Sequence, residues 1–79
     1  MTRDYYAECR SLAQDLDGVG LAEKGAQLVE DIEAGATSGE ILMALRFHLR
    51  GMARAGQSLP SSLRDRAEEL ACAMDEVLT

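Results

Sequence analysis

The sequence predicts an all-α fold, a small bundle of four helices in a single domain over residues 1–79. Ala, Leu, Glu and Arg dominate the composition, and all four are good helix formers. No stretch shows the Val/Ile/Thr-rich alternation that is typical of strands. Apolar residues instead recur at helical spacing in four segments. The chain has 79 residues, 47% of them hydrophobic, so one small core is expected rather than a disordered tail.

The first helix is expected over residues 3–16. One face carries its apolar residues: Tyr6, Cys9, Leu12, Ala13 and Leu16. The segment Asp17–Gly20 should end this helix, because its two glycines allow the left-handed turn that helix C-termini favour.

The second helix is expected over residues 21–34. Gly25 lies within its apolar stripe, where glycine costs up to about 1 kcal/mol relative to alanine. We therefore expect another helix backbone to approach closely there. Gly35 ends the helix, and only Ala36 separates it from Thr37, so the second and third helices should be antiparallel neighbours.

The third helix is expected over residues 38–55, and it is the only basic segment of an acidic chain. It opens with a capping box, in which Thr37 accepts from the N–H of residue 40 and the Glu40 carboxylate reaches back. Its apolar residues form one wide stripe: Ile41, Leu42, Leu45, Leu49 and Met52.

The fourth helix is expected over residues 60–78. Pro60 near its first position does no harm, since the missing N–H has no helical partner there, and Ser61 is an alternative N-cap. Short connections favour an up-down bundle. An arrangement in which the fourth helix packs across the other three remains open.

Charge narrows the classes of partner. The net charge is −6 and the pI is about 4.6. Binding of phosphate needs an excess of Lys and Arg, so direct contact with nucleic acid is not expected, and a basic protein partner is favoured. The N-terminus has no apolar signal core, and no run approaches the ~18 apolar residues of a membrane span. We expect a soluble cytoplasmic protein.

Two groups of residues on the third helix leave alternatives open. Arg46, Arg50 and Arg54 are four residues apart and share one face, where they either pair with acids of neighbouring helices or contact a partner. Met43 and Phe47 project away from the apolar stripe. They are core residues if this helix is central; otherwise they form an apolar patch for a partner or for self-association.

Acidic residues crowd the turn between the second and third helices. Glu30, Asp31 and Glu33 occupy the last turns of a helix, where the macrodipole disfavours anions. Together with Glu40 they form either a solvated helix end or a negative surface for a basic partner. The residues predicted to bind a partner are Glu30, Asp31, Glu33, Glu40, Met43 and Phe47.

No catalytic residues, metal ligands or cofactor site are expected, and an enzyme is the weaker hypothesis. No zinc, P-loop, dinucleotide or calcium-loop motif occurs. His48 is the only histidine, and it is expected to be a partly buried structural residue without a local orienting partner. Cys9 and Cys72 are expected to be small buried hydrophobes. A disulfide between them, or a thiol paired with His48, is the alternative.

The run from Ala34 to Leu49, AGATSGEILMALRFHL, resembles a pattern in small helical bacterial proteins. The pattern reads small-Gly-Ser/Ala-Thr, then Glu-Ile-Leu-Met, then Leu-Arg-aromatic-polar-Leu, with Phe47 in the aromatic position. Such proteins are encoded beside polymorphic toxins and are taken to be immunity proteins. The resemblance implies an inhibitor that binds a toxin domain, and it assigns no functional residue.

The acidity of the chain fits that implication. A nuclease toxin must be basic to hold phosphate, and carboxylates on a rigid surface can mimic that phosphate and steer association. The alternative is a self-associating structural or regulatory protein, a homodimer formed through the Arg/Phe face of the third helix.

Overall fold

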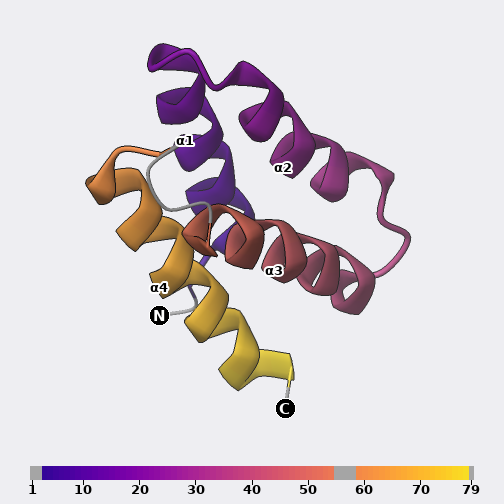
Figure 1. Cartoon of the computed structure of the whole chain (residues 1–79). Helices are drawn as coiled ribbons and strands as arrows, with labels where there is room; N and C mark the ends of the chain where they lie inside the picture. Colours follow the sequence, from indigo (N-terminus) through magenta and orange to yellow (C-terminus); the bar gives the residue numbers. More distant parts are fainter. Residues whose placement is uncertain (1–2, 55–58, 79) are drawn as a thin grey trace.

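A computed structural model describes residues 3–54 and 59–78, and this part of the chain is all-helical. Its helices are α1 (Tyr5–Gly18), α2 (Ala22–Ala34), α3 (Ser38–Arg54) and α4 (Ser61–Leu78). The predicted small four-helix bundle is confirmed (Figure 1). None of the described helices is both long and apolar enough to cross a bilayer. The end predicted for the third helix, residue 55, lies outside the described residues.

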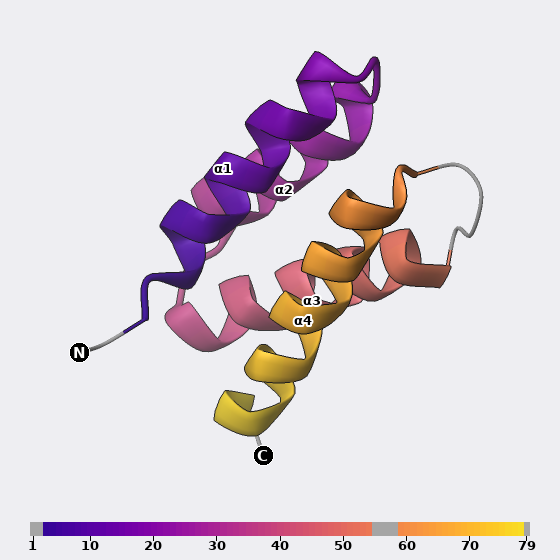
Figure 2. The same ribbon diagram turned by 90° about the vertical axis from the view of Figure 1, so that its left-hand side faces the viewer.

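The bundle is built from two helical hairpins. In both views α1 and α2 run side by side in opposite directions, and α4 packs against α3 and crosses it obliquely (Figures 1 and 2). The contacts between the hairpins, α2 with α3 and α1 with α4, are less extensive. Periodicity alone left this packing order open, because it identifies the apolar face of each helix but not the helix that covers it.

The core is aliphatic. Its fully buried large side chains come from all four helices: Cys9, Leu12, Leu16, Leu28, Leu45, Leu49 and Met74. Tyr5 and Tyr6 are only partly buried and pack against the edge of this cluster.

Gly25 allows the closest approach between two helices. A Cβ added there would lie 2.6 Å from the backbone oxygen of Ala13 on α1. No side chain fits at that distance, so the expected close approach is confirmed. The turn before α2 depends on a second glycine, because Gly20 has φ 83° in the left-handed region. Asp17 and Gly18 remain helical, and α1 therefore ends two residues later than predicted.

The helix starts follow from their caps. Asp4 Oδ1 accepts from the Ala7 N–H at 3.0 Å, so α1 begins at Tyr5 rather than at residue 3. Thr37 Oγ1 accepts from the Glu40 N–H at 3.2 Å, as the capping box predicts.

The fourth helix begins one residue later than predicted. The carbonyl oxygen of Pro60 accepts from the N–H groups of Leu63 and Arg64. Pro60 therefore precedes the first helical residue, Ser61.

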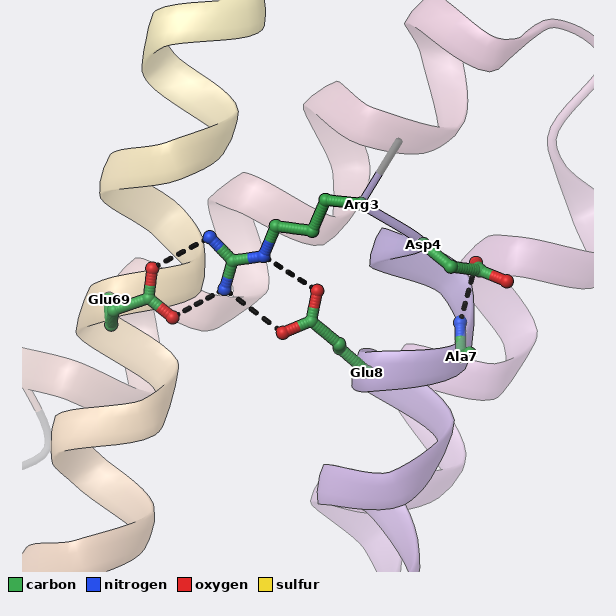
Figure 3. Close-up of polar contacts among 5 residues, drawn as sticks. All are labelled: Arg3, Asp4, Ala7, Glu8 and Glu69. Carbon is green, nitrogen blue, oxygen red and sulfur yellow. Dashed lines mark hydrogen bonds and ion pairs between the residues drawn. The ribbon is translucent and has the colours of Figure 1, made fainter. Parts of the chain in front are cut away.

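Ion pairs join α1 to α4 at the surface. The Arg3 guanidinium donates to Glu8 on α1 (Nε to Oε2, 2.6 Å) and to Glu69 on α4 (Nη1 to Oε2, 2.9 Å; Figure 3). These contacts raise the pKa of Arg3 and lower the pKa of the Glu69 carboxyl, since each favours the charged form. Arg66 of α4 pairs with Asp15 of α1. Part of the basic charge is thus used to hold the two hairpins together.

Candidate binding surfaces on α2 and α3

The outer face of α3 is exposed and partly apolar. The side chain of Phe47 is 74% exposed and that of Met43 is 50% exposed. The interpretation of these two residues as core is therefore wrong. The physical reason is the position of α3, which buries only its opposite face: Leu42, Leu45, Leu49 and Met52.

Two of the three arginines on α3 are paired within the molecule. Arg46 Nη1 lies 3.0 Å from Asp75 Oδ1 on α4, and Arg50 contacts the other oxygen of the same carboxylate. For these two residues the structure favours pairing over contact with a partner. Arg54 forms no ion pair within the described residues.

A buried carboxylate orients the single histidine. His48 Nδ1 on α3 lies 2.6 Å from Asp31 Oδ2 on α2, and Gln27 Nε2 donates to Asp31 Oδ1 at 3.3 Å. The Asp31 side chain is 8% exposed and that of His48 is 31% exposed. An ionised carboxylate can only accept, so the hydrogen of this contact is assigned to Nδ1.

Sequence reasoning missed this pair because its members lie on different helices. The antiparallel arrangement of α2 and α3 was predicted, but not the register that places Asp31 beside His48. The available signal was the charge of Asp31 in the last turns of α2, where the macrodipole disfavours an unpaired anion.

The pair removes Asp31 from the predicted acidic surface. Glu30, Glu33 and Glu40 remain exposed, and the structure shows no ion pair for them within its described part. The turn between them is tightly packed, because a Cβ on Gly35 would collide with the Ile41 side chain. The three carboxylates are thus carried by two helices, α2 and α3, that are joined by a well-packed turn. We call them the acidic edge.

A groove of about 850 Å³ lies beside the histidine between α2 and α3. His48, Phe47 and Met52 contribute to one wall, and Lys24 and Gln27 of α2 line the other. An imidazole held by a carboxylate is half of a general-base unit. The described residues that line the groove include no hydroxyl or thiol nucleophile. No group of three or more His, Cys, Asp or Glu side chains in the described chain is placed to hold a metal ion.

The two cysteines differ in environment, and both are free thiols. Cys9 is fully buried, as predicted. Cys72 is exposed on α4, so the prediction that it is buried is wrong, and the disulfide alternative is not observed. Burial, reinforced by the charges of Glu8 and Asp31, raises the pKa of the Cys9 thiol to about 12.

The buried thiol predicts a loss of stability at alkaline pH. The pKa of an unfolded cysteine is about 8.5, so above this value the unfolded chain has released a proton that folded Cys9 retains. The contribution of Cys9 to the free energy of unfolding should therefore fall as the pH rises above about 8.5, by at most about 1.4 kcal/mol per pH unit. Urea unfolding of the wild type and of Cys9→Ala at pH 8 and at pH 10 measures this change in the free energy of unfolding. An equal pH slope in both proteins would contradict this assignment.

Comparison with known protein families, with curated proteins and with solved structures finds no match. The resemblance to immunity proteins therefore stays a prediction.

Proposed function

We propose that this chain is a helical protein-binding module of the immunity type, which neutralises a basic toxin domain by direct binding. The contact is the acidic edge, Glu30, Glu33 and Glu40. The choice is supported by the position of these three acids on either side of one turn, together with the following observation. Acids at the helix–helix contacts, such as Asp15 and Asp75, pair with arginines, whereas the described structure shows no ion pair for the acidic edge.

Unpaired carboxylates on packed helices suit the capture of a basic surface. Helical placement fixes the backbone that carries them, so little backbone order has to be created on binding. Their field adds to that of a chain with a net charge of −6, which raises the association rate with a cationic partner. A phosphate-binding toxin presents such a surface.

Two residues of the predicted surface are left out of the toxin contact. Met43 and Phe47 share the outer face of α3 with Arg54, and Arg50 lies at its margin. A basic partner would bring like charges together there, which is unfavourable. The exposed apolar face of α3 therefore needs a different occupant.

Charge reversal at the acidic edge tests the proposed function. The proposal implies a toxin gene beside this one, and the C-terminal domain of its product is the probe. We expect Glu30→Lys/Glu33→Lys to slow association about tenfold at low salt and to weaken the dependence of the rate on salt. Stopped-flow association measures both effects.

The control carries the same change in charge at a different place. Asp65→Lys/Glu68→Lys reverses two exposed acids with the same spacing on α4. Its effect should be several-fold smaller, because only the long-range field changes. Equal rates for the two variants, or no binding by the wild type, would refute the proposal.

A further inference from the structure

The outer face of α3 is symmetric about Phe47. Five of its residues are spaced three or four positions apart: Glu40, Met43, Phe47, Gly51 and Arg54. All five are exposed. At 1.5 Å per residue, Glu40 and Arg54 lie about 10 Å on either side of Phe47, and Met43 and Gly51 lie about 6 Å on either side. A large residue therefore mirrors a small one, and an acid mirrors a base.

We propose that this face is the interface of a twofold-symmetric homodimer, in which α3 packs antiparallel against α3 of a second copy. A twofold interface brings the same patch of both subunits together and must be self-complementary. With the axis at Phe47, Glu40 of one copy faces Arg54 of the other, and Met43 faces Gly51. This interface is formed by α3 alone, but Glu40 belongs both to this face and to the acidic edge, so the dimer would cover one residue of the proposed toxin contact.

Shape complementarity is carried by Met43 and Gly51. A Cβ built on Gly51 meets nothing within 4 Å, so the helix surface there is open. Met43 is half exposed, and methionine adapts readily to irregular gaps. Each copy thus offers one knob and one hole, related by the axis. The two Phe47 rings meet on the axis itself, where aromatic pairs pack favourably.

The charges of Glu40 and Arg54 favour an antiparallel arrangement of the two α3 helices. A parallel pair of α3 helices would place Glu40 against Glu40 and Arg54 against Arg54, which repel. The antiparallel pair makes two Glu40–Arg54 contacts instead. The spacing of three and four residues is also that of a helix–helix seam. Because one face supplies both halves of every contact, a second copy is the occupant that fits it.

Sedimentation equilibrium between about 5 and 200 μM tests the interface, since small helix–helix contacts give micromolar affinities. The wild type should shift from a mass of 8.5 kDa towards twice that value. Glu40→Arg and Arg54→Glu should each raise the dimer dissociation constant about tenfold, since two ion pairs become two repulsions. Phe47→Asp should leave a monomer, with its helix content unchanged in circular dichroism.

The double variant Glu40→Arg/Arg54→Glu tests the register. It exchanges the two ends of the face and restores opposite charges across the axis, so its dissociation constant should return to within about threefold of the wild-type value. A wild type that stays monomeric at 200 μM, or a double variant as weak as the single ones, would overturn the proposal. Glu30→Lys/Glu33→Lys changes the two residues of the acidic edge that lie on α2, outside this face, so it should weaken toxin binding and leave dimerisation unchanged.

Discussion

Gly25→Ala should lower the free energy of unfolding by about 2–3 kcal/mol, because the new methyl group has no space. Its Cβ would lie 2.6 Å from the Ala13 oxygen and 3.2 Å from the Ala13 Cα. Both atoms belong to the backbone of α1, so the clash can be relieved only by moving the two helices apart. Alanine is the better helix former by about 1 kcal/mol, which offsets part of this loss. Thermal and urea unfolding give the net value.

Gly39→Ala is the matched control for that substitution. Gly39 also lies in a helix, α3, but a Cβ there meets nothing within 4 Å. The same chemical change should therefore leave stability unchanged or raise it by a few tenths of a kcal/mol. An equal loss of stability in both variants would contradict the claim that α1 and α2 are too close at Gly25 to admit a methyl group.

His48→Ala should cost about 2 kcal/mol, because it leaves the buried Asp31 carboxylate with Gln27 as its only partner in the described structure. His48→Gln should cost less, since an amide N–H can still donate to the carboxylate. The double variant Asp31→Ala/His48→Ala removes both halves of the pair. Its loss should be about 1–2 kcal/mol smaller than the sum of the single losses.

Urea unfolding at pH 7 gives the coupling between the two side chains. Additive losses would show that the contact between Asp31 and His48 contributes nothing to stability. Asp15→Ala is a suitable comparison, since the exposed pair of Asp15 with Arg66 should contribute 1 kcal/mol or less.

The fold could be predicted because it depends on local patterns. Apolar periodicity, the Thr37 cap and the role of Gly25 were all readable from neighbours within a few residues. The predicted helix boundaries differ from the observed ones where a cap or a turn determines the end of the helix, as at Asp4 and Gly18. These differences are small because the caps themselves obey local rules.

The candidate surfaces were harder to predict because they depend on which helix covers which face. Met43 and Phe47 carry the same apolar signal whether α3 is central or peripheral, and only packing distinguishes the two cases. Asp31 was assigned to the surface because its charge suggests solvent. His48, which pairs with Asp31, lies on another helix. No local pattern specifies the register of α2 and α3 that brings the two side chains together.

Inhibition of the proposed toxin partner by two variants tests most directly whether surface charge, rather than a reactive side chain, carries the proposed function. His48→Gln/Cys72→Ser removes the only imidazole and the exposed thiol, while Glu30→Lys/Glu33→Lys reverses two carboxylates of the acidic edge. With both variants folded, as judged by circular dichroism, we expect the first to inhibit like the wild type and the second to lose inhibition at least tenfold. Loss of inhibition in the first variant with retention in the second would contradict the proposed function.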